Sequence, residues 1–357
     1  MNKPFSTIAF VVPYFGRFNN YFQLWLDSCA ANKTIDWLIF TDDRREFDYP
    51  KNVHVTYTTL ENVCKRAEKT LNCHVCLDFP YKLCDLKPIY GVIFADELKE
   101  YDFWGYCDTD LIWGNIRTFI PEETLAVTDK IFSFGHCTII RNCERTNNAF
   151  KMPTNGVDDY RKVVTEPYIF GYDESDEINM VFRIHFPNTF YEKCFCFDVN
   201  VSKQNFYPAP RSTVGIPGIR DAPYLFLYNK DKLIGFCLYD DELISKEFMY
   251  LHLQKRIMTN DNCKRNNQYI IVPNKFINGS EITVKDFSHY LFRHECSWLN
   301  FRRKIMRYID AIFDSAQPKP YHRGRLQYVF DKLFGRDKRY RYPFMEDFLQ
   351  NDANLNQ

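Results

Sequence analysis

Short apolar runs alternate with amphipathic stretches along the first part of the chain. Residues 8–12 (IAFVV) and 36–40 (DWLIF) are β-branched and aromatic runs that end at polar or turn-forming residues, which predicts two buried strands. Between them, residues 21–30 (YFQLWLDSCA) have apolar positions at helical spacing. The positions that share this face are Phe22, Trp25, Leu26 and Cys29. The strand–helix–strand order favours a parallel sheet with crossover helices.

The same patterns continue through the rest of the chain. Further strands are predicted at residues 53–58, 103–107, 131–140, 248–253 and 269–272, and a hairpin at 224–227 and 233–238. Helical spacing occurs in residues 81–98, as two pieces, and in 142–150 and 177–182. From about residue 285 the sequence becomes helical, basic and aromatic. We therefore predict an α/β domain over residues 1–284, with a mixed, mostly parallel sheet flanked by helices, followed by a helical basic segment over 285–357.

Composition narrows the class of protein. The 357 residues are 45% hydrophobic and 17% aromatic, which is enough for a substantial core. The formal net charge is zero, and this balance argues against nucleic acid as a partner. The first apolar run is far shorter than the roughly 20 residues that span a bilayer, so we expect a cytoplasmic protein.

The 13 cysteines are then expected to be mostly reduced and buried. Cys64, Cys73, Cys76 and Cys84 lie close together in the sequence and include a single C-x-x-C. Buried free thiols and a structural zinc site are both compatible with this spacing.

A pair of carboxylates follows the strand predicted at 103–107, in the stretch YDFWGYCDTDLIWGNI (101–116). Asp108 and Asp110 are two residues apart, so their side chains point the same way if the backbone stays extended. Ligands of α/β sheets bind at the carboxyl ends of strands. Two hard oxygen donors at such a place suit Mg²⁺ or Mn²⁺ on a diphosphate, whereas the alternative is a pair of solvated loop carboxylates.

This arrangement resembles the D-x-D motif of GT-A nucleotide-sugar glycosyltransferases. Residues 172–182 (YDESDEINMVF) resemble the D-Q-D-x-L-N element of the glycogenin and lipopolysaccharide-galactosyltransferase group, in which Asp176, Ile178 and Asn179 match. Ser175 stands where that group has Gln, and Glu174 where it has the first Asp.

A later stretch fits the same resemblance. Residues 249–256 (MYLHLQKR) are similar to the group's H-x-x-G-x-x-K-P element, with His252 matching, Lys255 as an approximate counterpart of the Lys, and the Gly absent.

Over most of residues 8–258 the chain also resembles an uncharacterised bacterial family inferred to make surface polysaccharides. The shared stretches are VVPYFG (11–16), PYKLCDLKPIYG (80–91), the D-x-D segment, FGHCTIIRN (134–142), YDE (172–174) and YLHLQKR (250–256).

The resemblance implies a GT-A-like, Rossmann-type fold and a set of site residues. Asp108, Asp110 and His252 would hold Mn²⁺ or Mg²⁺. The basic residues expected on the donor diphosphate are Lys255 with Lys82 or Lys87, and Asp85 would face the donor sugar. The alternative for Lys82 and Asp85 is a surface ion pair between i,i+3 neighbours.

Other candidate site residues follow from their places at strand and helix ends. Pro13, Tyr14 and Phe15 could cradle the nucleotide, and Asp42 and Asp43 could bond its base or ribose, or all five are ordinary turn residues.

Further acids come just before the helix predicted at 177–182. Asp173 and Glu174, with Asp176, are the candidates for catalysis near the sugar, or they are acids at a helix N-terminus. His136 could contact the acceptor or be a satisfied core histidine.

The C-terminal segment is strongly basic. Its cations between residues 302 and 341 are Arg302, Arg303, Lys304, Arg307, Lys319, Arg323, Arg325, Lys332, Arg336, Lys338, Arg339 and Arg341. They are interspersed with aromatic and aliphatic residues, so the segment could lie on an anionic membrane surface or pack back on the domain with its charges solvated.

The expectation is therefore a metal-dependent glycosyltransferase of bacterial capsule, lipopolysaccharide or related glycan synthesis. Its donor would be a nucleotide-diphosphate sugar, most simply a UDP-sugar, and its acceptor a glycan or lipid-linked glycan at the inner face of the membrane. The glycogenin-like resemblance favours a retaining hexosyltransferase. One alternative is a sugar-1-phosphate nucleotidyltransferase, which needs a Gly-rich basic loop where this chain has only Gly16 and Arg17. Another is a non-catalytic protein that binds glycans or nucleotide sugars.

Overall fold

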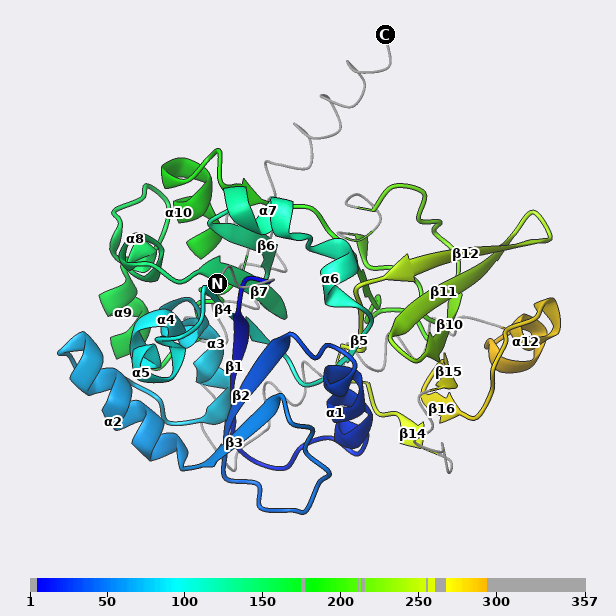
Figure 1. The fold of residues 1–357 in the computed structure, drawn as a ribbon, viewed down its shortest axis with the longest axis horizontal. Coiled ribbons are helices and arrows are strands. Elements are labelled where there is room, and N and C mark those ends of the chain that lie inside the picture. The colour runs from blue at the N-terminus through cyan, green and yellow to red at the C-terminus, as the bar shows by residue number, and fades with distance from the viewer. Residues whose placement is uncertain are drawn as a thin grey trace, which may run out of the picture.

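A seven-stranded mixed sheet forms the centre of the computed structural model, which describes residues 5–174, 177–210, 212, 216–254, 256–260 and 268–293 (Figure 1). The strand order is β3-β2-β1-β4-β7-β6-β8. Pairing is parallel from β3 through β4 and between β6 and β8, and antiparallel on both sides of β7. The strands are β1 Ile8–Tyr14, β2 Ile35–Thr41, β3 Val53–Tyr57, β4 Phe103–Cys107, β6 Lys130–Phe134, β7 Cys137–Arg141 and β8 Phe190–Tyr191.

Helices cover both faces of this sheet, which explains why its central strands read as continuous apolar runs. In β1, Phe10 and Val12 pack in the core on the side of α1 (Phe22–Ala30), whereas Ala9 and Val11 pack in the core on the opposite side. The helices that contribute to the opposite core are α2 Leu60–Leu71, α3 Leu83–Leu86, α4 Tyr90–Ile93, α5 Ala95–Leu98, α9 Tyr160–Thr165 and α10 Ile178–His185.

Short helical turns complete the layers around the sheet. They are η1 Pro80–Lys82, η2 Lys87–Ile89, α6 Ile116–Phe119, α7 Glu122–Val127, α8 Glu144–Asn147 and η3 Ala149–Lys151. Residues 80–98 therefore form a chain of one-turn helices, where the sequence predicts two longer pieces. Pro88 and Gly91 interrupt the pattern there.

Two further sheets are built mainly from the second half of the chain. A three-stranded sheet has the order β5-β13-β9, with β5 Leu111–Trp113, β13 Tyr250–His252 and β9 Cys196–Asp198. A six-stranded sheet has the order β12-β11-β10-β15-β16-β14 and lies at the end of the molecule away from α2 (Figure 1). Its strands are β10 Tyr224–Asn229, β11 Lys232–Tyr239, β12 Glu242–Phe248, β14 Thr259–Asn260, β15 Gln268–Val272 and β16 Lys275–Ile277.

The helix α12 (Val284–Tyr290) begins at the predicted domain boundary and packs on the six-stranded sheet. Phe287 of this helix shares a small core with Leu225, Leu227, Ile270 and Val272. The basic residues of the predicted C-terminal segment lie outside the described residues.

The structure confirms the predicted fold class, a mixed and mostly parallel sheet flanked by helices.

Two strand predictions are wrong. Residues 131–140 form two antiparallel strands, β6 and β7, joined by Gly135 and His136. Residues 248–253 are divided at Met249, because β12 and β13 belong to different sheets. In both stretches the residues around the break are buried, so exposure does not mark where one strand ends.

Candidate metal centre and binding cavity

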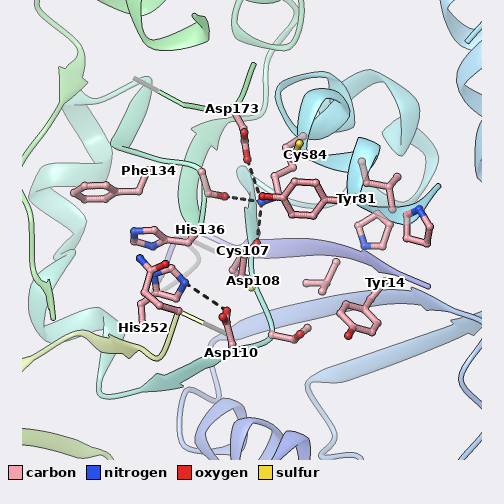
Figure 2. A pocket seen from close by; sticks show the side chains of 18 of the residues that line it. Tyr14, Tyr81, Cys84, Cys107, Asp108, Asp110, Phe134, His136, Asp173 and His252 are labelled. Carbon is pink, nitrogen blue, oxygen red and sulfur yellow. Dashed lines mark hydrogen bonds and ion pairs between the residues drawn. The ribbon is translucent and has the colours of Figure 1, made fainter. Parts of the chain in front are cut away.

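A cavity of about 820 Å³ opens at the carboxyl ends of β1 and β4. Its wall is assembled from the ends of β1, β4, β9 and β13, the β6–β7 turn, and the residues that precede α10. Figure 2 shows side chains from β1, β4, β13, the β6–β7 turn and the segment before α10 converging on one space. This is the edge at which α/β sheets bind ligands, and the volume suits a ligand the size of a nucleotide.

The D-x-D carboxylates lie on the floor of this cavity, between β4 and β5. The Asp108 N–H donates to the His136 carbonyl at 3.1 Å, and the Leu253 N–H donates to the Asp110 carbonyl at 2.9 Å. These two bonds fix the D-x-D turn between β4 and β5 to the β6–β7 connection and to the end of β13. Asp110 is buried, and Asp108 is more exposed.

His252 reaches this turn because β13 pairs antiparallel with β5, where it lies opposite Leu111. Its Nε2 is 3.5 Å from Asp110 Oδ1, and Figure 2 shows the ring directed at that carboxylate. Ligand atoms of Asp108, Asp110 and His252 lie within 4.8 Å of one another. Two carboxylate oxygens and one imidazole nitrogen fit Mn²⁺ or Mg²⁺, and the imidazole suits Mn²⁺ better.

The other nitrogen of His252 contacts a carboxylate that the sequence analysis missed. Nδ1 is 2.9 Å from Asp198 Oδ1. Burial lowers the pKa of His252, but Asp110 and Asp198 outweigh this and raise the pKa to about 10. Burial alone would raise the pKa of Asp198. The interaction with His252 opposes burial, and the pKa lies below its ordinary value. No local motif identifies Asp198, since it meets His252 only through the pairing of β9 with β13.

His136 lies beside His252, with ring centroids 4.2 Å apart (Figure 2). Its Nδ1 is 3.0 Å from the Tyr250 hydroxyl, and its ring stacks on Phe134. Burial and the neighbouring His252 lower its pKa to about 3, so this imidazole is neutral. His136 therefore lines the cavity and is also satisfied by a hydrogen bond, and its predicted contact with the acceptor stays a prediction.

Lys87 links the D-x-D turn to the acids that precede α10. Its Nζ donates to Asp108 Oδ1 at 2.8 Å and to the Gly135 carbonyl at 2.7 Å, and it lies 3.1 Å from Asp173 Oδ2. Burial lowers the pKa of Lys87, but the two carboxylates more than compensate and the pKa is raised. Burial also raises the pKa of Asp173, to about 7, against the opposing effect of Lys87. Glu174 borders the same cavity and is exposed.

Lys82 and Asp85 are placed differently from their predicted roles. Both side chains are fully buried, they pair at 2.8 Å, and neither lines the cavity. They are therefore neither a surface ion pair nor in contact with a ligand in the cavity. Asp85 accepts the N–H groups of Phe170 and Tyr172, so the pair anchors the segment that leads to Asp173.

The end of β1 contributes Pro13 and Tyr14 to the cavity wall, and the loop that follows contributes Phe15. The Asp42 carboxylate accepts the Gly16 N–H at 2.7 Å, and the Asp43 carboxylate accepts the Phe18 N–H at 2.9 Å.

Both aspartates thus hold this loop rather than face the cavity. They line a shallow neighbouring depression instead. A hydrogen bond from Arg45 lowers the pKa of Asp43 to about 2, so its carboxylate stays charged.

Two predicted site residues, Asp176 and Lys255, lie outside the described residues. The cysteines predicted as alternative zinc ligands make separate contacts: Cys64 Sγ bonds the Val75 carbonyl and Cys76 Sγ bonds Asp78. Among the described residues, the side-chain groups close enough to share a metal ion include no cysteine.

A family model described as "Family of unknown function (DUF6625)" matches residues 10–280. The chain belongs to DUF6625. No curated protein matches the sequence of this DUF6625 member.

In the described part of the chain, none of the helices has the length and apolar character to cross a bilayer.

Solved structures similar to this DUF6625 member include the galactosyltransferase LgtC in complex with donor and acceptor sugar analogs. The match has 13% identity and a TM-score of 0.29, and it covers 54% of this chain and 75% of LgtC. The glycosyltransferase GlyE of Streptococcus pneumoniae TIGR4 matches at 10% identity with a TM-score of 0.26, over 52% of this chain and 45% of GlyE. Mouse xyloside xylosyltransferase 1 matches at 7% identity with a TM-score of 0.28, over 55% and 88% of the two chains. At these scores the likenesses carry no argument, and the site has to be interpreted from its own geometry.

Proposed function

We propose that this DUF6625 member is a metal-dependent glycosyltransferase that uses a nucleotide-diphosphate sugar. The observation that carries the proposal is the convergence of Asp108, Asp110 and His252 at the floor of the cavity. Three such ligands leave other coordination positions for diphosphate oxygens. A metal bound there would neutralise charge on the departing nucleoside diphosphate.

The surrounding groups suit the rest of the reaction. Lys87 places a buried positive charge next to Asp108, which favours the bound diphosphate and its release from the sugar. Asp173 lies on the other side of Lys87 from Asp108, and Asp173 and Glu174 both border the cavity, where the sugar and the acceptor hydroxyl would lie. Because the pKa of Asp173 is near 7, this carboxyl can hold or release a proton near neutral pH.

The donor and acceptor are proposed from the same site. Pro13 and Tyr14 at the end of β1, with Phe15 after them, would receive the base, and a UDP-sugar is the donor we favour. The acceptor would be a glycan or a lipid-linked glycan of bacterial surface polysaccharide, in contact with His136. We propose hexosyl transfer with retention of configuration, as the sequence resemblance implies. Catalysis would then take place at the inner face of the cell membrane, with the basic C-terminal segment as the contact.

Thermal unfolding of the full chain tests the donor and the metal together. UDP, GDP, CMP and dTDP are each added with and without Mn²⁺ to the wild type, to Asp110→Ala and to the control Asp96→Ala, whose carboxylate is exposed on α5. A ligand at ~100 times its dissociation constant adds about 2.7 kcal/mol, which is a measurable increase in Tm. We expect one nucleotide to raise the Tm only with Mn²⁺, in the wild type and the control but not in Asp110→Ala.

Other outcomes point to other functions. If no nucleotide raises the Tm, the proposal is wrong. If a nucleotide binds but no UDP-sugar is hydrolysed or transferred, the chain is a non-catalytic nucleotide-sugar-binding protein. Formation of a nucleotide sugar from a sugar 1-phosphate and a nucleoside triphosphate would instead identify a nucleotidyltransferase.

A further inference from the structure

Asp198 is a buried carboxylate that lies behind the proposed metal ligand His252. In the three-stranded sheet, His252 of β13 pairs with Asp198 of β9 on one side and with Leu111 of β5 on the other. The imidazole ring is therefore enclosed between two carboxylates, with Nδ1 2.9 Å from Asp198 and Nε2 3.5 Å from Asp110.

Asp198 is itself held in place by several hydrogen bonds. The Gln254 side chain donates to its carboxylate at 2.5 Å, and its own N–H donates to Ser212 Oγ at 3.2 Å. Its carbonyl accepts the Ala209 N–H at 2.7 Å. A buried carboxylate costs free energy unless it is paired, and this one is directed at the imidazole and at Gln254. The arrangement fixes the carboxylate before any ligand enters the cavity.

We propose that Asp198 is a positioning residue that holds His252 with Nε2 directed at the metal site. This inference rests on the proposed function, because it gives Asp198 a role only if Asp108, Asp110 and His252 bind the ion. A histidine that bonds a carboxylate through Nδ1 has its tautomer and ring orientation fixed, and Nε2 becomes a better ligand. Asp110 lies on the opposite side of the ring, close to Nε2, so the ion would bind between Nε2 and the Asp110 carboxylate.

A competing arrangement uses some of the same atoms. His136, Asp198 and His252 also have ligand atoms close enough to share an ion. In that case Asp198 would bind the metal itself, and its 2.9 Å ion-pair contact with His252 Nδ1 would be lost. The existing 2.9 Å contact, and the Tyr250 hydroxyl on His136 Nδ1, favour the positioning role.

Electron paramagnetic resonance of Mn²⁺, alone and with UDP, tests this on the full chain. The loss of the free Mn²⁺ signal gives the affinity, and nitrogen modulation in pulsed spectra reports a bound histidine. For Asp198→Ala we expect Mn²⁺ affinity to fall roughly 10–100-fold, the typical effect of removing such a partner, with loss of the nitrogen modulation. Asp198→Asn keeps an oxygen that can accept the Nδ1–H, so it should recover part of the affinity and the nitrogen signal. His136→Gln removes a ligand only from the competing arrangement, so it should lower Mn²⁺ affinity much less than Asp198→Ala does.

The results separate this inference from the proposed function. If the wild type does not bind Mn²⁺ with or without UDP, the proposed metal site is wrong, and the role of Asp198 with it. If the wild type binds Mn²⁺ through nitrogen and Asp198→Ala does the same with equal affinity, only the positioning role is wrong. If His136→Gln weakens Mn²⁺ as much as Asp198→Ala, the ion occupies the competing site. Should Asp198→Ala fail to fold, Asp198→Leu keeps the side-chain volume but has no acceptor for Nδ1, and wild-type Mn²⁺ affinity in that variant would overturn the inference alone.

Discussion

At the scale of single residues, Asp173 is a buried carboxyl whose protonation depends on pH near neutrality. Burial raises its folded pKa to about 7, from an unfolded value of about 3.9. The folded state therefore keeps a proton that the unfolded state has released, and the wild type loses stability as pH rises from about 4 to 7. We expect Asp173→Asn to be more stable than the wild type above pH 7, by a few kcal/mol at ~1.4 kcal/mol per pKa unit, with the difference shrinking towards pH 4.

Urea unfolding of both proteins without metal, from pH 4.5 to 8.5, measures this difference. His252 is common to both chains, so its own titration cancels. A difference in unfolding free energy that does not change with pH would show that Asp173 has no raised pKa. The same variant should transfer little or no sugar if Asp173 acts at the sugar or acceptor.

Lys130 is a second buried titratable group, and it lies outside the cavity. Its Nζ donates to the carbonyl of Phe132 and to Asn179 Oδ1 at 2.7 Å, and it lies over the Phe190 ring. Burial lowers its pKa well below the ordinary value and outweighs the opposing effect of Glu192. From that lowered pKa up to the unfolded value of about 10.4, the unfolded chain binds the extra proton, so the wild type gains stability as pH rises.

Lys130→Met has no such group, so its stability relative to the wild type should be greatest at low pH and decline steadily towards pH 10. Matched denaturant titrations at pH 6, 8 and 9.5 give this slope. A relative stability that rises with pH, or stays level, would contradict a neutral buried lysine. At any one pH, the difference in unfolding free energy between Lys130→Met and the wild type also includes the lost bond to Asn179. The test is therefore how this difference changes with pH.

At this scale the sequence could point to residues of the cavity wall only where a motif is local. Asp108 and Asp110 stand out because they follow an apolar strand, and His252 because of its neighbours in the chain. Asp198 and Lys130 could not be found this way, since their surroundings come from distant segments. The predicted donor contacts of Lys82 and Asp85 failed for a related reason. A motif gives the spacing of two side chains but not whether their shared face points to a cavity or to the core.

At the scale of elements, the β6–β7 hairpin places its turn against the acids that precede α10. A Cβ added at Gly135 would lie 2.7 Å from Asp173 Oδ2 and 2.9 Å from Glu174 Oε1. Both atoms are ends of side chains that can move. Gly135→Ala should therefore displace the two carboxylates at small cost in stability. We expect kcat/KM to fall by about tenfold to a hundredfold, because misplacement by an ångström can have that effect.

The matched control is Ser133→Ala, one position before Phe134 in the same hairpin, whose backbone carbonyl still accepts from Asn179. Steady-state sugar transfer and thermal unfolding of both variants make the comparison. If Gly135→Ala keeps full activity, the two carboxylates are not needed in their present positions. If its Tm falls sharply while the control's does not, the glycine serves the fold rather than the reaction.

The hairpin also shows which elements the sequence can predict. The strands at 8–12, 36–40 and 103–107 were predicted because each is an apolar run with a clear polar or turn-forming end. The sequence of residues 131–140 predicts a single strand because both arms are buried and lack alternation. The bulge at Phe132, with a φ of 69°, is a further local departure that propensities do not predict. Pairing between β9, β13 and β5 depends on contacts across the whole chain, so the candidate site could be predicted only in part.

At the scale of the whole molecule, charge is divided unevenly along a chain that is neutral overall. Residues 302–341 carry many more Lys and Arg than Asp and Glu, so the rest of the protein has an excess of negative charge. That remainder contains every described residue of the cavity wall, the last being Ile257. An acidic domain is repelled by an anionic leaflet, whereas each Lys or Arg near such a surface contributes about 1 kcal/mol of attraction. Recruitment to a membrane-bound acceptor would therefore depend on the basic segment.

A chain ending at residue 293 tests this division, because it keeps the cavity and the packing of α12 through Phe287. We expect it to retain the Mn²⁺-dependent increase in Tm with nucleotide but to lose binding to vesicles that contain anionic lipid. The full chain should sediment with those vesicles, not with neutral ones, and should dissociate as salt increases, because screening weakens this attraction. Equal vesicle binding by both chains would place the membrane contact elsewhere. If neither chain binds vesicles and the shortened one is much less stable, the segment packs on the domain instead.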